Sequence, residues 1–172
     1  VWVGGGGVFG HFDGSSVRVG THRIRGSIEQ ILGVDQDVWL LTRSSINAEA
    51  RLVRSSGEQV TEWDVDKDGV TLSGIGASHV WRSGKPAAVW DGETWKPLGF
   101  DASSVWARTV DDVYFVNRGD ISRWNGKTLE RAFHGLIPIV RISGSLDRGF
   151  AVGPGGLTVE FARWPTRLLG IH

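Results

Sequence analysis

The sequence contains no cysteine, which excludes disulfides, thiolate metal sites and a cysteine nucleophile, and which leaves the redox compartment open. It also contains no methionine, so we expect the chain to be processed or cut from a longer one. Lysine plus arginine total 19, and so do aspartate plus glutamate, so no net charge favours nucleic acid as a partner. No apolar run approaches the roughly 18 residues of a membrane span, so membrane insertion is not expected.

Glycine and tryptophan are abundant instead, with 25 and 9 copies in 172 residues. Frequent glycine suits an all-β chain with many tight turns. Frequent tryptophan suits a repeat protein that uses the same residue at the same position of each repeat. The length is that of one domain with a sizeable core.

A pattern of four short strands recurs along nearly the whole chain. Its clearest copies are HVWRSGKPAAVWDG at 79–92 and DVYFVNRGDISRWNG at 112–126. The matching residues of the second strand are Val3, Leu41, Ser83, Val116 and Val152, with gaps of 38, 42, 33 and 36 residues. A period of this size, with strand signals only, predicts a β-propeller or another β array.

The repeats predict a single β-propeller domain over 1–172, with units at about 1–26, 27–68, 69–99, 100–135 and 136–172. The first unit lacks its first strand. We therefore expect an all-β fold of four-stranded blades, with five blades of which the first is incomplete, or a fragment of a larger propeller. An incomplete ring would leave strand edges exposed, which predicts self-association.

Two local features support this architecture. The dipeptides Asp13-Gly14, Asp91-Gly92 and Asn125-Gly126 predict type I′ hairpin turns, whose central residues both need a positive φ. One blade cannot cover both of its own faces, so large side chains at a shared repeat position are expected to pack between blades. The residues at that position are Trp39, Trp81 and Tyr114.

The repeat D-V-W-x-V-G…G-x-I-x-R-W-D-G-x-x-W resembles that of bacterial β-propellers of the sialidase-like and photosystem-assembly-factor-like kind, common in secreted myxobacterial proteins. The best matches are at 112–116, 153–156 and 90–95. The resemblance implies a blade rather than an activity, and it favours an extracellular or cell-envelope location. Sialidases use a tyrosine nucleophile, but the single tyrosine, Tyr114, occupies the packing position of the repeat.

One segment has the spacing of a calcium loop. Asp64, Asp66 and Asp68 precede Gly69 in a D-x-D-x-D-G pattern, which places three carboxylates around a sharp bend. The twelfth position, where such loops carry glutamate, is Ile75. The alternative is a solvated, aspartate-rich turn between blades. Calcium is the only cofactor that the sequence suggests.

No nucleophile motif of the G-x-S-x-G type is present, and no pair of carboxylates converges in the repeat pattern. We therefore expect a non-catalytic, lectin-like binding or interaction module that presents a face of loops to a glycan or a protein partner. The loops between second and third strands, and those between blades, supply the candidate ligand-binding residues Arg23, Arg25, Arg43, Asn47, Lys85, Arg118, Asp120 and His134. The alternatives are a glycoside-active enzyme of sialidase-like or lyase type, and a structural fragment of a longer propeller.

Overall fold

The computed structural model describes residues 1–5, 8–20, 24–66, 70–136, 138–161 and 168–171, and their side chains up to residue 160. Nearly all regular structure in these residues is β-strand, apart from one short 3-10 turn, η1 (Pro154–Gly156). The chain forms two compact units, Val1–Val70 and Thr71–His172, which we call the N-terminal and C-terminal units.

The N-terminal unit contains two antiparallel sheets whose strands follow one another in chain order. The first sheet consists of β1 (Trp2–Gly5), β2 (Val8–Phe12) and β3 (Val17–Val19). The second sheet consists of β4 (Ser27–Val34), β5 (Asp37–Arg43), β6 (Ala50–Ser56) and β7 (Gln59–Val65).

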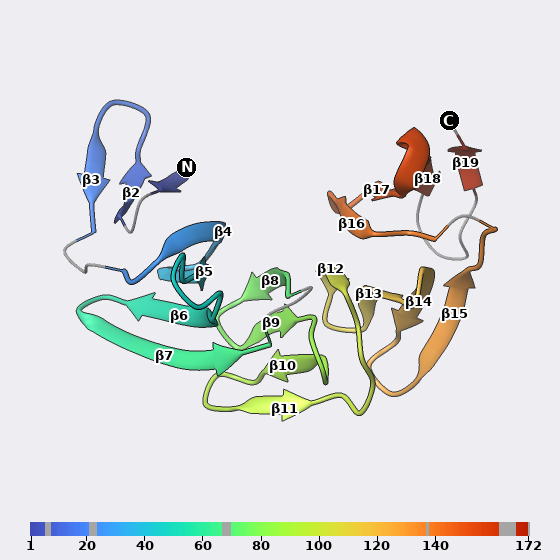
Figure 1. Ribbon diagram of the computed structural model, residues 1–172, viewed down its shortest axis with the longest axis horizontal. Coiled ribbons are helices and arrows are strands. Elements are labelled where there is room, and N and C mark those ends of the chain that lie inside the picture. Colours follow the sequence, from blue (N-terminus) through green and yellow to red (C-terminus); the bar gives the residue numbers. More distant parts are fainter. Residues whose placement is uncertain (6–7, 21–23, 67–69, 137, 162–167, 172) are drawn as a thin grey trace. The chain divides into compact units, whose positions relative to one another are not determined.

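The C-terminal unit contains three four-stranded antiparallel sheets, again with neighbouring strands in chain order (Figure 1). The third sheet consists of β8 (Leu72–Gly76), β9 (His79–Arg82), β10 (Ala88–Trp90) and β11 (Trp95–Pro97). The fourth consists of β12 (Ser104–Thr109), β13 (Asp112–Asn117), β14 (Asp120–Trp124) and β15 (Leu129–Phe133). The fifth consists of β16 (Arg141–Gly144), β17 (Gly149–Val152), β18 (Thr158–Phe161) and β19 (Leu168–Ile171).

Five antiparallel sheets, each drawn from one consecutive stretch of chain, confirm the predicted all-β fold of propeller blades. The first sheet has three strands in the described residues and the other four have four each, as the repeat pattern predicted. The assignment of all 172 residues to one domain stays a prediction.

In the C-terminal unit, the third and fourth sheets pack face to face. Trp81 of β9 lies in one cluster with Val105, Val113 and Phe115 of the fourth sheet, and all four are buried. We call the face that a sheet turns to the preceding sheet its trailing face, and the opposite face its leading face. Trp81 thus extends from a leading face onto a trailing face. This contact confirms the packing role predicted for Trp81.

The fourth and fifth sheets repeat this arrangement. Tyr114 of β13 is fully buried and stacks on Trp106, with ring centroids 5.2 Å apart. Both rings pack against Ile142, Ala151 and Val159 of the fifth sheet. Tyr114 is therefore on a leading face as well, and its predicted role in packing between blades is confirmed.

In the N-terminal unit, too, aromatic side chains of one sheet pack on the next sheet. Trp2 and Phe9 of the first sheet pack on Val38 and Leu40 of the second. Trp39, on the opposite face of β5, is fully buried and stacks on Trp63 with centroids 5.7 Å apart.

In the first sheet the structure corrects the alignment of the repeats. Placing Val3 level with Leu41 would put Val1 at the position of Trp39, but Trp2 is the residue on the leading face. A slip of one position moves every side chain of a strand to the other face of the sheet. The first copy of the repeat is therefore shifted by one residue, so that Trp2 and not Val1 corresponds to Trp39.

The hairpin turns differ from the prediction. Among the described residues, the non-glycine residues with positive φ are Asp35, Ala48 and Arg118, so Asp13, Asp91 and Asn125 do not form type I′ turns. Their side chains instead accept hydrogen bonds from backbone amides two and three residues later, as in an Asx turn. The two consecutive positive φ angles of a type I′ turn occur at Arg118 (51°) and Gly119 (89°), between β13 and β14.

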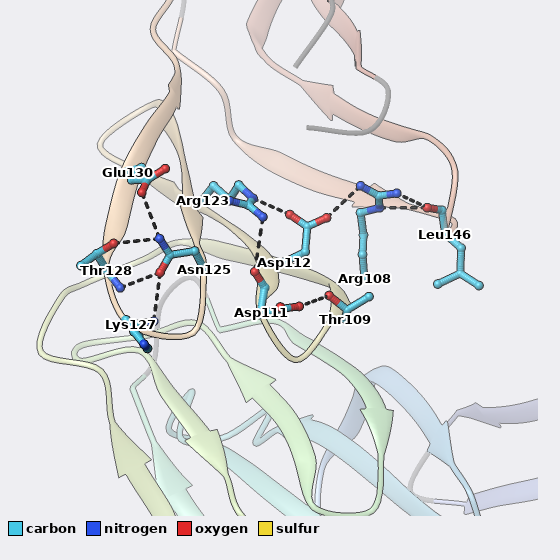
Figure 2. Close-up of polar contacts among 10 residues, drawn as sticks. All are labelled: Arg108, Thr109, Asp111, Asp112, Arg123, Asn125, Lys127, Thr128, Glu130 and Leu146. Atoms are coloured by element: carbon cyan, nitrogen blue, oxygen red, sulfur yellow. Dashed lines mark hydrogen bonds and ion pairs between the residues drawn. The ribbon is translucent and has the colours of Figure 1, made fainter. Parts of the chain in front are cut away.

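A network of charges connects the fourth and fifth sheets at the end of β13 opposite to that turn (Figure 2). Asp112 accepts hydrogen bonds from Arg108 (2.8 Å) and Arg123 (2.5 Å). Arg108 also donates to the backbone carbonyl of Leu146, in the loop between β16 and β17. The side chains of Arg108, Asp112 and Arg123 are 9, 13 and 17% exposed, so the surrounding solvent screens these interactions only weakly.

Replacing Asp112 with alanine should therefore lower the free energy of unfolding by about 3–5 kcal/mol, because two arginines would lose their counter-charge in a buried site. The measurement is urea denaturation of Asp112→Ala beside Asp111→Ala, whose side chain is exposed and whose loss should cost less than about 1 kcal/mol. Equal losses for the two variants would contradict a structural role for the network.

Asp91 provides a pH-dependent test of the Asx turns. Hydrogen bonds from the backbone amides of Thr94 and then Glu93 lower the pKa of the Asp91 carboxyl from 3.8 to about 2. Because the folded pKa is the lower one, the carboxylate stabilises the fold above its unfolded pKa, and this contribution is lost as the pH falls from about 4 to about 2. Asp91→Asn keeps an acceptor oxygen, as Asn125 does in the fourth sheet, and should lack this part of the pH dependence.

The measurement is thermal unfolding of both proteins between pH 2 and 5, with a carboxyl titration of Asp91 by NMR. A titration midpoint near the ordinary aspartate value would show that the turn does not form in solution.

Candidate functional site

The candidate site is a pocket at one end of the C-terminal unit, where the β13–β14 turn meets the connection between the third and fourth sheets. It has a volume of about 460 Å³. Its lining is mainly polar and consists of Gly99, Phe100, Asp101, Asn117, Arg118, Asp120, Ser122 and Arg131. Two of the candidate residues from the sequence, Arg118 and Asp120, therefore come together here.

The β13–β14 turn is held by the chain that follows β15. The backbone amide of Ile139 donates to the carbonyl of Gly119 at 2.8 Å. A Cβ built on Gly119 would lie 2.6 Å from the Cβ of Pro138, so glycine is needed there for space as well as for its φ angle. The turn is thus a fixed support for the side chain of Arg118, which is exposed.

Asp120 is surrounded by positive or proton-donating groups. Nδ1 of His134 donates to its carboxylate at 2.7 Å, and the guanidinium of Arg131 lies 3.7 Å away. The Asp120 side chain is 25% exposed, whereas those of Arg131 and His134 are 68% and 63% exposed. His134 is therefore held beside the pocket by Asp120, which places three of the eight predicted residues in one cluster.

Arg118 differs from these residues because it makes no hydrogen bond or ion pair with the part of the chain that the structure describes. Its guanidinium carries five donors in a planar fork, and it can pair with a carboxylate through two hydrogen bonds. Asp101, also exposed, adds a second acceptor to the pocket wall. The pocket can thus bind an anionic group at Arg118 and hydrogen-bond donors at its carboxylates.

A second pocket, of about 430 Å³, lies in the N-terminal unit at the loop between β5 and β6. It is lined by Arg25, Gly26, Thr42, Ser44, Ser45, Ile46, Asn47, Glu49 and Arg51. Two further candidates, Arg25 and Asn47, are thus neighbours. Arg51 already pairs with Glu49, Glu62 and Asp64 at 3.4–3.9 Å, so most of the positive charge here is neutralised.

The other candidates have separate positions. Arg43 pairs with Glu29 at 2.5 Å and donates to the carbonyl of Ala48, so it supports the β5–β6 loop rather than a ligand. Lys85 is exposed and lines neither pocket. Arg23 lies outside the described residues.

The predicted calcium loop is described only in part, because Asp68 lies outside the described residues. Asp64 is 3.4 Å from Arg51, and Asp66 is exposed. The described residues contain no group of three or more His, Asp or Glu side chains that could hold a metal ion. The calcium site therefore stays a prediction, and titration calorimetry of the protein and of Asp66→Ala would test it.

The tyrosine that a sialidase-like mechanism would need is not accessible. Tyr114 is fully buried under Trp106. Burial, and then the charge of Asp112, raise the pKa of its phenol above the ordinary value, which disfavours the ionised, nucleophilic form.

The sequence did not single out Phe100, Asp101, Ser122 and Arg131 as pocket residues. Ser122 pairs with Arg131 across β14 and β15 and with Phe115 across β13 and β14, so these three share one face. The hairpins β13–β14 and β14–β15 could have indicated that these three side chains lie side by side, since paired residues of antiparallel strands point to the same face of the sheet. Asp101 lies in a connection between blades, a class of loop that the sequence did point to.

Comparisons with known proteins support the fold and not a family. No protein-family model matches the chain, and no curated protein matches it. Solved structures do match, among them the crystal structure of Kap60 bound to yeast RCC1 (Prp20), with a TM-score of 0.53 and 12% sequence identity. The match covers 80% of this chain but only 42% of the solved one, so this chain spans less than half of that neighbour.

The neighbour is a propeller of RCC1 repeats, and the likeness confirms the propeller-type fold. At this identity it shows the fold alone. None of the described residues belong to a helix with the length and apolar character of a membrane span.

The geometry predicts different costs for alanine at Gly119 of the β13–β14 turn and at Gly99 of the pocket lining. Gly119→Ala should destabilise the protein by about 2–4 kcal/mol, because it combines a positive φ with a clash against Pro138. Gly99→Ala has a similar φ of 79° but open space around the new Cβ, so its cost should be only about 1 kcal/mol. Urea denaturation measures both. Equal costs would show that the turn does not pack on Pro138.

Proposed function

We propose that the protein is a non-catalytic β-propeller interaction module that binds a protein partner at the pocket of the C-terminal unit. In this proposal Arg118 binds a carboxylate of the partner, from an Asp or Glu side chain. The observation that carries the proposal is Arg118 itself, an exposed cation without a partner among the described residues, held over a polar pocket.

The backbone of Arg118 supports this role. The first central position of a type I′ turn favours Asn, Asp or Gly, and a left-handed conformation costs other L-residues roughly 1–2 kcal/mol. Arginine therefore stands at a position where it does not serve stability. Residues that keep an unfavourable backbone conformation tend to occur at binding and catalytic sites.

The composition of the pocket supports a peptide rather than a free anion. Asp101 and Asp120 would repel a small anion, but they can accept hydrogen bonds from backbone amides or a lysine of a peptide. The ring of Phe100 adds an apolar surface for a side chain of the partner. A segment with an acidic residue flanked by donor groups fits this set of charges.

The structural neighbour is consistent with a protein partner, since the solved structure is a complex of RCC1 with Kap60. A glycan ligand, as a lectin-like module of the sialidase-like repeat type would bind, is the second outcome that the experiment distinguishes. A sialidase-like mechanism with a tyrosine nucleophile is disfavoured because the single tyrosine, Tyr114, is buried.

Arg118→Asn separates binding from stability. Asparagine tolerates the left-handed conformation, so the variant should unfold at the same temperature as the parent or slightly above it. It should nevertheless bind acidic peptides at least about tenfold more weakly, because a charge-assisted hydrogen bond contributes about 1.5–3 kcal/mol. The matched control is Lys127→Asn, which removes one positive charge in the turn at the other end of β14.

The measurement is binding to an array of synthetic peptides that differ in their number of Asp and Glu side chains, beside a glycan array. Selective peptide binding that Arg118→Asn weakens and Lys127→Asn does not would support the proposal. Glycan binding with the same dependence would identify a lectin-like module. Peptide binding that is unaffected by Arg118→Asn, or binding to neither array, would overturn the proposal.

A further inference from the structure

A further pocket lies within the N-terminal unit, between the first and second sheets. It has a volume of about 400 Å³, and all of its lining residues lie between positions 2 and 57. Trp2, His11 and Arg18 are paired with one another across β1, β2 and β3, so their side chains share one face of the first sheet. This is the leading face, which packs on the second sheet.

Aromatic rings form one wall of this pocket. The rings of Trp2 and His11 have centroids 4.8 Å apart, and the ring of Phe9 lies 6.1 Å from that of Trp2. Phe9 is buried, whereas Trp2 and His11 are only half-buried. The two half-buried rings can therefore offer an aromatic ligand the offset or edge-to-face contacts that such rings prefer.

Two glycines make room for these rings. A Cβ built on Gly33 of β4 would overlap the indole of Trp2, and one built on Gly20 would lie 2.7 Å from the ring of Phe9. Because the backbone lies directly against both rings, the aromatic wall is fixed in the free protein, as is usual for small-molecule sites.

The opposite wall carries a buried hydroxyl group. Ser55 of β6 is paired with Val38 of β5, so both side chains point from the trailing face of the second sheet towards the first. Ser55 is 8% exposed, and its hydroxyl makes no hydrogen bond with the part of the chain that the structure describes. Buried polar groups normally have a hydrogen-bond partner, so this hydroxyl indicates a ligand with a polar atom.

The charge of the lining restricts the class of ligand. Arg18 and Gln36, which lies in the β4–β5 turn, are exposed and make no hydrogen bond or ion pair with the described residues. The described residues of the lining include no Asp or Glu, so the pocket is positive at Arg18. A guanidinium binds a carboxylate through two parallel hydrogen bonds. A sugar would bring several hydroxyl donors for which this lining has no carboxylate acceptor, so an aromatic ring fits better.

We propose that this pocket binds a small aromatic carboxylate. The ring of the ligand lies against Trp2 and His11, Arg18 pairs with its carboxylate, and the hydroxyl of Ser55 donates to one of its oxygen atoms. The site shares no residue with the peptide pocket of the C-terminal unit, so it adds a second binding activity to the protein.

Two substitutions test the polar contacts. Arg18→Gln removes a charge from an exposed side chain, and Ser55→Ala removes the buried hydroxyl. Neither side chain has a hydrogen-bond partner in the described residues, so urea denaturation should show no loss of stability for either variant. The control is Arg141→Gln, which removes an exposed arginine from β16 of the C-terminal unit.

The measurement is titration calorimetry with three probes: 6-hydroxy-2-naphthoate, 2-naphthol, which lacks the carboxylate, and glucuronate, which lacks the aromatic ring. The parent protein and Arg141→Gln should bind 6-hydroxy-2-naphthoate more tightly than either other probe. Arg18→Gln should bind it at least about tenfold more weakly, because a charge-assisted pair is lost. Ser55→Ala should bind it about fivefold more weakly, because one hydrogen bond is lost.

Failure of the parent protein to bind 6-hydroxy-2-naphthoate would overturn the proposal, and so would binding that either variant leaves unchanged. Equal affinity for glucuronate would show that the aromatic wall is not what the ligand contacts. A marked loss of stability in Ser55→Ala would show that the hydroxyl serves the fold, which would also contradict the proposal. Arg118→Asn should leave this binding unchanged, so the outcome is independent of the peptide pocket.

Discussion

Sheets with two apolar faces impose the main constraint on this molecule. In β13 four consecutive residues, 113–116, are fully buried, and they point alternately to the two sides of the fourth sheet. Such a strand cannot face water on either side, because each buried aliphatic or aromatic side chain contributes roughly 1.5–3 kcal/mol only when it is covered. The third sheet covers one side and the fifth covers the other, which makes the three sheets of the C-terminal unit mutually dependent.

In the fourth sheet, two polar clusters lie at the two ends of β13. At one end of β13, Asp112 and its two arginines form a nearly buried network whose partners are all within the protein. At the other end, the β13–β14 turn supports Arg118, whose side chain has no partner in the described residues. The first arrangement stabilises the stack of sheets, while the second leaves a charged group available to a partner. We therefore assign a binding role to the end of β13 near Arg118 and a stabilising role to the end at Asp112.

The sequence by itself determined the strands, their grouping into sheets and two of the residues that pack between sheets, Trp81 and Tyr114. These features are local, because the alternation of side chains and the repeat of Trp39, Trp81 and Tyr114 can be read from neighbouring residues. The turn types were harder to predict. Asp91 and Asn125 precede glycine as in a type I′ turn, but their side chains bind the backbone amides ahead of them and select a different turn.

Only the tertiary structure decided the site. It placed Lys85 outside the linings of both pockets, gave Arg43 a structural partner in Glu29, and brought Arg131 and Asp101 beside Arg118. Arg131 reaches the pocket through the register of β14 and β15, and Asp101 through the packing of two sheets. The position of Asp101 is not encoded in any short stretch of sequence, because residues far apart along the chain become neighbours only when the sheets pack.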